Sequence, residues 1–217
     1  MNLKKLFSYF LPLRLKNYSS ELNGNMEINL VNGKKVLDTK SSNYSFGSLQ
    51  RILEHGLKAI HFDERFKNIL VLGMGAGSIV ESVRIRFGSD ARITLVDIDP
   101  LMARIAEEEF GIRQYENVLI HIQDAEAFVQ NSRENYDLII VDLFIIATIP
   151  EKFTKKSFID LLSARVSDKG SIVYNTIRKT LPSPAREEII EDFKRNGFET
   201  KILKEIEYSN DLILASK

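Results

Sequence analysis

The sequence has no cysteine and no tryptophan, and it has only three histidines among 217 residues. Without cysteine the chain can form no disulfide, no thiolate metal site and no thiol nucleophile. His55, His61 and His121 do not show the spacing of metal ligands, so we expect no metal site. A site made of carboxylates alone stays open.

The chain also lacks net charge and long apolar runs. Thirty basic residues balance thirty acidic ones, so no overall field attracts nucleic acid or an anionic membrane. The run from Leu6 to Leu11 is followed by Pro12 and lacks a small-residue cleavage site, which argues against a signal peptide. It is also too short to span a bilayer. We interpret the first fifteen residues as an amphipathic segment that packs on the domain or on a second subunit, and we expect a cytoplasmic protein.

With 44% hydrophobic residues, the chain can bury a full core. Residues 26–38 alternate in polarity around the turn dipeptide Asn32-Gly33, which predicts a β-hairpin. Apolar residues then recur at helical spacing over residues 49–60. We therefore divide the chain into an N-terminal segment with a hairpin and a helix, residues 1–62, and a ligand-binding domain, residues 63–217.

From residue 68 onward, predicted strands alternate with predicted helices. The strands are short, nearly continuous apolar runs at residues 69–72, 93–96, 118–122, 138–141 and 171–175. Helices are expected after Gly77, Pro100, Asp124, Thr154 and Ser183. This alternation is typical of a parallel sheet that is covered on both faces. Residues 198–206 and 212–215 predict a closing antiparallel hairpin.

A glycine-rich loop follows the first of these strands. Gly73 permits a tight turn, Gly75 lets the backbone approach a ligand, and Gly77 lets the next helix start close to the strand. The start of that helix offers free N–H groups to a carboxylate or a phosphate. Asp97 lies 24 residues after Gly73, where an acid can accept hydrogen bonds from ribose hydroxyls.

Acidic residues end three successive strands: Asp97, Asp124 and Asp142. Each has an alternative interpretation, since Asp124 could cap the following helix and Asp142 could be a solvated strand end. Taken together behind one glycine loop, they predict a pocket for an adenosine-containing ligand. Ser78 stands where the dinucleotide pattern G-x-G-x-x-G requires its third glycine, which favours S-adenosylmethionine over NAD. Asn175 at the end of the fifth strand could face the same pocket.

The order GMGAGS, LVDIDP, IQDAEAF and YDLIIVDLF resembles the spermidine synthases and their methyltransferase-like relatives, over about residues 26 to 176. The resemblance implies an α/β, Rossmann-like class I methyltransferase fold. Its sheet would be mostly parallel, with seven strands, a C-terminal antiparallel hairpin and a small N-terminal β-hairpin extension. It also implies S-adenosylmethionine or its decarboxylated form as the ligand, and a homodimer as one possible assembly.

The same resemblance implies roles for individual residues. Asp97 matches the family's ribose-binding acid, Asp124-Ala125 its adenine-side pair, and Asp142 an acid of its transfer site. The candidate cofactor-binding residues are Gly73, Gly75, Gly77, Asp97, Ile98, Asp124, Ala125 and Asp142. The candidate catalytic residues are Asp142, which could orient or deprotonate an acceptor, and Tyr44, which could cover the cofactor.

Three positions depart from the family's pattern. Ala76 stands where the polyamine enzymes have an acid in the glycine loop, and Ile145 stands where they have a second acid after Asp142. Residues 46–48 replace a Tyr-His-Glu segment. Because these acids bind and deprotonate a cationic amine, we favour a methyltransferase with an unidentified small-molecule acceptor. Aminopropyl transfer from decarboxylated S-adenosylmethionine, and a non-catalytic adenosyl-ligand-binding protein, are the alternatives. An NAD-dependent oxidoreductase is a weaker one.

Overall fold

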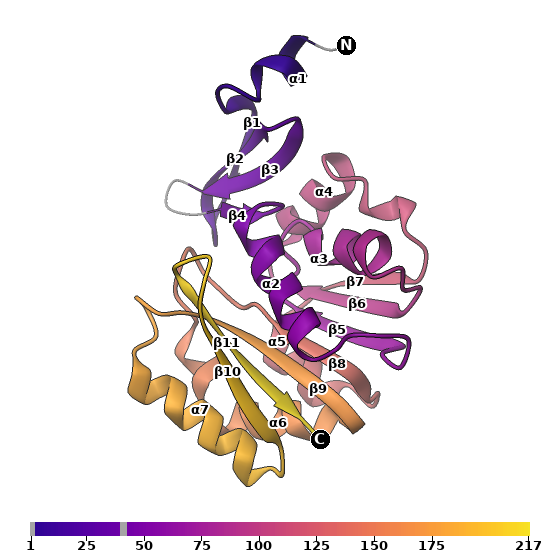
Figure 1. Ribbon diagram of the computed structural model, residues 1–217, viewed down its shortest axis with the longest axis vertical. Coiled ribbons are helices and arrows are strands. Elements are labelled where there is room, and N and C mark those ends of the chain that lie inside the picture. Colours follow the sequence, from indigo (N-terminus) through magenta and orange to yellow (C-terminus); the bar gives the residue numbers. More distant parts are fainter. Residues whose placement is uncertain (1–2, 40–42) are drawn as a thin grey trace.

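A computed structural model describes residues 3–39 and 43–217 of the chain, which form a small antiparallel sheet and a large, mostly parallel sheet (Figure 1). The large sheet has the strand order β10-β11-β9-β8-β5-β6-β7. Its strands are β5 (Asn68–Leu72), β6 (Arg92–Asp97), β7 (Val118–Ile122), β8 (Tyr136–Val141), β9 (Val166–Ile177), β10 (Glu199–Ile206) and β11 (Asn210–Ser216). Strands β5 to β9 pair in parallel, and β11 pairs antiparallel with both β9 and β10.

The expected fold is therefore confirmed, including the closing hairpin and the seven-stranded sheet. All five predicted parallel strands are present, with ends that differ by one or two residues except in β9. That strand begins five residues earlier than predicted, because Val166 pairs with Tyr136 ahead of an irregular stretch of the ladder. The apolar runs are nearly continuous because these strands are covered on both faces.

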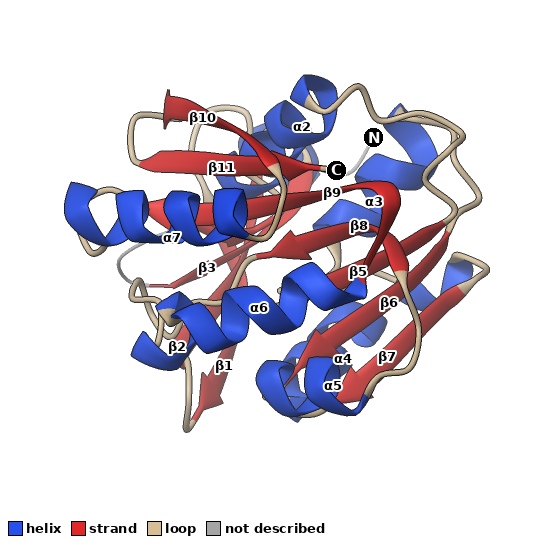
Figure 2. Cartoon of the chain, turned by 90° about the horizontal axis from the view of Figure 1, so that it is seen from below, coloured by secondary structure: helices blue, strands red, loops and turns tan. Residues whose placement is uncertain are grey.

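Helices cover the two faces of the large sheet, as Figure 2 shows. The helices are α2 (Ser48–Ala59), α3 (Ser78–Glu81), α4 (Pro100–Glu108), α5 (Ala125–Asn131), α6 (Lys156–Arg165) and α7 (Ser183–Arg195). A π-helical turn, Ser82–Arg86, continues α3, and 3-10 turns lie at Ile112–Gln114 and Glu151–Thr154. Strand β5 supplies both cores: Ile69 and Val71 pack with α2, α3 and α4, while Leu70 and Leu72 pack with α5, α6 and α7. This alternation follows the two-residue period of a strand.

The small sheet precedes the large one and has the order β1-β2-β3-β4. Its strands are β1 (Leu13–Ser20), β2 (Gly24–Val31), β3 (Lys34–Thr39) and β4 (Asn43–Ser45). The predicted hairpin is confirmed as β2 and β3, joined at Asn32-Gly33, where both residues have positive φ angles of 49° and 77°. Strands β1 and β4 add to it. The division of the chain at residue 62 stays a prediction.

The N-terminal helix α1 (Leu3–Phe7) has no buried residue. The leucine and phenylalanine side chains of α1 are exposed at the far end of the small sheet (Figure 1). The segment nevertheless contacts this sheet, because the N–H of Gly33 donates to Oγ of the buried Ser8 at 2.9 Å. Packing on a second subunit stays a prediction. Among residues 3–39 and 43–217, no helix has the length and apolar character needed to cross a membrane.

Two carboxylates beside α4 join the small sheet to the large one. Glu109 accepts hydrogen bonds from Lys16 Nζ at 2.7 Å, from Tyr18 Oη at 2.7 Å and from Lys35 Nζ at 2.9 Å. Asp99, which caps α4 through Leu101 N–H at 2.9 Å, also accepts hydrogen bonds from the turn between β1 and β2. This turn is thereby held above the ends of the parallel strands.

Candidate active site

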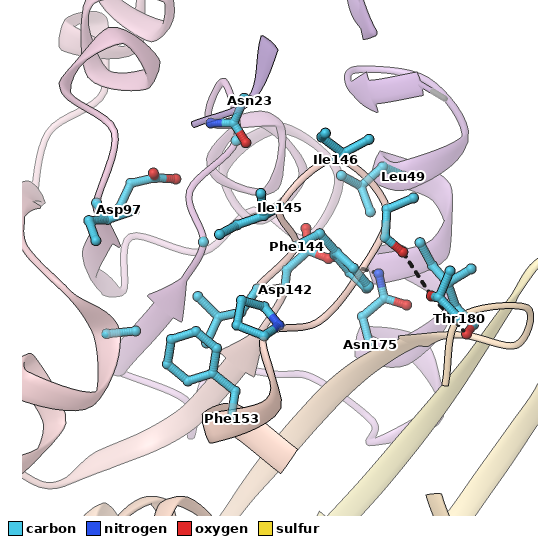
Figure 3. A pocket seen from close by; sticks show the side chains of 18 of the residues that line it. Asn23, Leu49, Asp97, Asp142, Phe144, Ile145, Ile146, Phe153, Asn175 and Thr180 are labelled. Carbon is cyan, nitrogen blue, oxygen red and sulfur yellow. Dashed lines mark hydrogen bonds between the residues drawn. The ribbon is translucent and has the colours of Figure 1, made fainter. Parts of the chain in front are cut away.

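A cavity of about 670 Å³ lies at the carboxyl ends of the parallel strands, within the size range of small-molecule sites. The loops that follow β5, β6, β7 and β8 form its floor and sides, and α2 and the β1–β2 turn contribute further wall. Figure 3 shows Asp97 and Asp142 in this cavity, with Asn23 on the side of the small sheet. Such strand ends are where open α/β sheets bind ligands.

The glycine loop after β5 meets the cavity at two of its three predicted positions. Gly73 has a φ of 84°, and a Cβ there would lie 2.1 Å from the carbonyl oxygen of Asp142. Gly73 therefore allows the loops after β5 and β8 to approach each other. Gly75 also lines the cavity, with a φ of 51°.

Gly77 does not line the cavity, contrary to the prediction that it contacts the cofactor. Its φ is 82°, and a Cβ would lie 2.4 Å from Cδ1 of Ile112. The absence of a side chain at Gly77 thus serves the packing of α3, which agrees with its predicted second role.

Asp97 ends β6 and is 9% exposed. Its carboxylate accepts the N–H of Met74 and the N–H of Asp99, each at 3.0 Å. Burial raises the pKa of Asp97 to about 6, although these backbone N–H groups oppose the rise. The side chain therefore braces the glycine loop and lies at the cavity surface, next to the half-exposed Ile98.

Asp124 takes the helix-capping role that the sequence offered, and its contact with a ligand stays a prediction. Its Oδ1 accepts the N–H of Ala127 at 3.1 Å and so caps α5, while its Oδ2 pairs with Nζ of Lys152 at 2.5 Å. Burial alone would raise the pKa of Asp124, but the hydrogen bonds from Lys152 and Ala127 hold it below its usual value. Asp124, Ala125 and Lys152 all line the cavity.

Asp142 belongs to a chain of hydrogen bonds at the opposite end of the cavity. Nδ2 of Asn175 donates to Oδ1 of Asp142 at 2.8 Å, and Nδ2 of Asn210 donates to Oδ1 of Asn175 at 2.9 Å. Burial raises the pKa of Asp142 to about 7, the hydrogen bond from Asn175 opposes this rise, and the charge of Asp97 adds to it. The structure thus brings Asn175 to the cavity, which the sequence had left open, and adds Asn210, which the sequence did not indicate.

The loop after Asp142 forms an apolar wall, with Phe144, Ile145 and Ile146 in the cavity lining (Figure 3). Backbone hydrogen bonds of 3.0 and 3.1 Å join Ile145 to Thr148 and close a tight turn. Ile146 within this turn has a φ of 62°, a conformation that β-branched residues avoid. Oγ1 of Thr180 donates to the carbonyl oxygen of Ala147 at 2.8 Å and ties the loop to the segment after β9.

The other predicted positions have different outcomes. The backbone of Tyr44 belongs to β4, but its side chain lies outside the described residues, so its catalytic role stays a prediction. Ala76 is fully buried, and its N–H donates to Oγ of Ser45 at 3.2 Å. Ser48 lines the cavity, whereas Phe46 stacks on Phe110 with ring centroids 4.2 Å apart. Among the described residues, no group of three or more His, Asp or Glu side chains is arranged to hold a metal ion.

The fold and the cavity define a Rossmann-like α/β protein with a ligand site behind a glycine loop and an acidic strand end. Residues 49–205 match the spermine/spermidine synthase domain, and the chain belongs to this family.

Two relatives illustrate the range of reactions among similar proteins. A polyamine aminopropyltransferase of Vibrio vulnificus is 29% identical over 123 residues, which cover 55% of this chain and 41% of that protein. An N-terminal histidine N-methyltransferase of Emericella nidulans is 36% identical over 113 residues, which cover 50% of this chain and 19% of that protein. Both are transferases, and the chain spans less than half the length of these relatives.

Solved structures of a probable spermidine synthase and of a methyltransferase-like protein have the same fold as this chain. A probable spermidine synthase of Corynebacterium glutamicum has a TM-score of 0.69 and 19% identity, covering 95% of this chain and 77% of that one. Human methyltransferase-like protein 13, in complex with SAH, has a TM-score of 0.63 and 20% identity, covering 78% of this chain and 82% of that one. The fold thus occurs in a neighbour that binds a product of methyl transfer.

Proposed function

We propose that this protein is an S-adenosylmethionine-dependent methyltransferase built on the scaffold of the spermine/spermidine synthase family. The residues at one end of the cavity fit the adenosyl ligand by their chemistry. Asp97 accepts the backbone N–H groups of Met74, Gly75 and Asp99, and its two carboxylate oxygens have further acceptor sites for ribose hydroxyls. The backbone of Gly75 and the Asp124-Ala125 pair supply further polar contacts at the same end.

The observation that favours methyl transfer is the small number of carboxylates at the end of the cavity where the acceptor would bind, beside Asp142. Among the described residues, three carboxylates line the cavity, and two of them lie at the adenosyl end. Asp97 braces the glycine loop and Asp124 pairs with Lys152, so Asp142 alone faces the acceptor space. A diamine carries two positive charges, and one buried carboxyl group cannot match both.

The neighbouring residues point the same way. Ile145 lines the cavity where the polyamine enzymes carry a second acid, and Lys179 adds a positive charge to the wall. Both features oppose the entry of a cationic acceptor, because an ammonium group would lose water without gaining a partner.

Asp142 is the residue we assign to proton removal. S-adenosylmethionine supplies a methyl group bound to a positively charged sulfur. When the methyl group is transferred, the sulfur leaves as part of a neutral thioether. Asn175 fixes Oδ1 of Asp142, and the other carboxylate oxygen is left to accept a proton from the acceptor. A pKa of about 7 puts the carboxylate form of Asp142 within reach near neutral pH. The loop around Phe144 gives this end an apolar wall.

Aminopropyl transfer remains the second candidate, because family membership and the Vibrio vulnificus relative favour it. The two candidates differ in the donor, S-adenosylmethionine or its decarboxylated form, and in the charge of the acceptor. The loss of acids at Ala76 and Ile145 is what weighs against the second candidate.

The first experiment is isothermal titration of the purified protein with S-adenosylmethionine and with its decarboxylated form. We expect saturable one-to-one binding of S-adenosylmethionine, weakened about tenfold or more by Asp97→Asn. The control is Asp90→Asn, which makes the same charge change at an exposed residue just before the start of β6. Release of 5′-methylthioadenosine in the presence of putrescine would overturn the proposal in favour of aminopropyl transfer. Binding of S-adenosylmethionine without turnover across an acceptor screen would instead indicate a non-catalytic binding protein.

A further inference from the structure

Large apolar side chains are exposed to solvent in the wall at the acceptor end of the cavity, the end that contains Asp142. Ile145 is 41% exposed and Ile146 is 53% exposed, and both belong to the cavity wall. Leu49 and Ile52 from α2 line the cavity with them. Large apolar side chains that remain exposed in a concave site favour a ligand that covers them.

The loop that carries these side chains is held in place at an energetic cost. Ile146 adopts a left-handed backbone conformation with a φ of 62°, which is strained for a β-branched residue. Two contacts hold the loop in this conformation: the hydrogen bond from Thr180 to Ala147, and the bridge between Ile145 and Thr148. Strain that is retained in this way is found at ligand-binding loops more than elsewhere.

Asp142 is the one carboxylate among the polar groups at this end, which include hydroxyl, amide and ammonium side chains. One of its carboxyl oxygens accepts a hydrogen bond from Asn175, and Asn175 in turn accepts one from Asn210. Figure 3 shows Asp142 and Asn175 side by side. Lys179 is the cation of this part of the lining. An aliphatic amine would carry a positive charge near neutral pH, whereas a hydroxyl compound brings a transferable proton without a charge.

We propose that the methyl acceptor is an uncharged, largely apolar hydroxyl compound of about the size of a phenol, held against the Ile145–Ile146 wall with its hydroxyl at Asp142. This inference rests on the proposed methyltransferase function and adds the substrate class. In the reaction, the acceptor oxygen bonds to the methyl carbon and the carbon–sulfur bond breaks with its electron pair going to sulfur. The hydroxyl proton passes to the carboxylate of Asp142.

The test uses two probes that differ only in a charged group: 4-ethylphenol and tyramine, which is the same phenol with an ammonium on its side chain. Each is titrated into the full chain saturated with S-adenosylhomocysteine, and binding is followed by saturation-transfer NMR, with putrescine as a third probe. We expect 4-ethylphenol to bind at least about tenfold more tightly than tyramine, because the ammonium would be desolvated against apolar side chains.

The matched variants are Ile145→Asp and Ile85→Asp. Ile85 lies in the π-helical turn, is 69% exposed and does not line the cavity. Ile145→Asp should weaken 4-ethylphenol binding about tenfold and strengthen tyramine binding, whereas Ile85→Asp should change neither.

The outcomes separate this inference from the function on which it rests. If S-adenosylhomocysteine binds but tyramine binds as tightly as 4-ethylphenol, the acceptor class is wrong and the methyltransferase proposal stands. The same conclusion follows if Ile145→Asp leaves the preference unchanged. If putrescine binds as tightly as 4-ethylphenol, the acceptor class is wrong and the argument against aminopropyl transfer fails with it. If neither S-adenosylmethionine nor S-adenosylhomocysteine binds, both proposals fail. The preference of the unaltered protein decides the matter even if a variant does not fold.

Discussion

The contact between Glu109 and the small sheet offers a sharp test of how the two sheets are held together. The Glu109 side chain is 11% exposed and accepts three hydrogen bonds, two from lysines and one from Tyr18. Glu109→Gln removes the charge while keeping the shape of the side chain. We expect Glu109→Gln to lower the free energy of unfolding at neutral pH and to have no effect in strong acid.

The magnitude follows from the pKa of Glu109. Burial alone would raise this pKa, but hydrogen bonds from Lys16 and Lys35 lower it from 4.5 to about 2. At about 1.4 kcal/mol per pH unit, this change sets a ceiling of roughly 3 kcal/mol on the stabilisation by the charged form. Both lysines are 39–49% exposed and are therefore screened by solvent. We expect Glu109→Gln to lower the free energy of unfolding by about 1–2 kcal/mol at pH 7.

Urea denaturation at pH 7 and at pH 2.5 measures this effect. A lowered folded-state pKa gives stability that is present above pH 4.5 and is lost as the pH falls toward 2, so the variant and the wild type should converge in acid. Glu108→Gln is the control, because Glu108 is 49% exposed and lies 3.7 Å from Lys16. The reasoning is refuted if Glu109→Gln unfolds at the same urea concentration as Glu108→Gln at pH 7, or if its deficit at pH 2.5 is as large as at pH 7.

Two further predictions concern the cavity. Gly73→Ala should lower the free energy of unfolding by more than about 3 kcal/mol, since it combines positive-φ strain with a clash against Asp142. Gly88 is also at positive φ but has open space around it, so Gly88→Ala should lower the free energy of unfolding by about 1 kcal/mol. Equal melting temperatures for the two variants would contradict this prediction. The stability of the wild type relative to Asp142→Asn should fall as the pH rises from about 4 to about 7 and level off above 7, because in this range the unfolded chain loses the Asp142 proton while the folded protein retains it. Guanidinium denaturation between pH 4 and 8.5 checks this, and a constant difference between the two proteins would count against it.

The parts of the fold that were predictable are those whose pattern is local. The apolar runs of β5, β6 and β8 are buried on both faces, which leaves a signal in consecutive residues, and the partly exposed edge strand β7 has a similar run. Strand β1 was not predicted, because residues 14–17 are exposed and its sequence carries charge on a solvated face. The exposure of the apolar side chains of α1 was also not predictable, since an apolar pattern does not reveal what covers it.

The candidate site divides along the same line. Gly73, Gly75 and Asp97 reach the cavity because a strand, a turn and the next strand are fixed by short sequence motifs. Gly77 was misplaced because a glycine needed for contact with Ile112 looks the same in sequence as one needed for a ligand. Asn210 was missed because its position depends on the register of β11 against β9, which is set by tertiary pairing rather than by a local motif.

The turn between β1 and β2 connects the cavity to the anchoring of the small sheet. Leu22 and Asn23 line the cavity, and Nδ2 of Asn23 donates to Asp99 at 2.8 Å, two residues beyond Asp97. Thermodynamic linkage is reciprocal. If the attachment of this turn to Asp99 increases the affinity of the cavity for a ligand, the bound ligand must stabilise that attachment by the same free energy. Filling the cavity should therefore slow hydrogen exchange of the β2 amides, so the small sheet would report occupancy without any knowledge of the reaction.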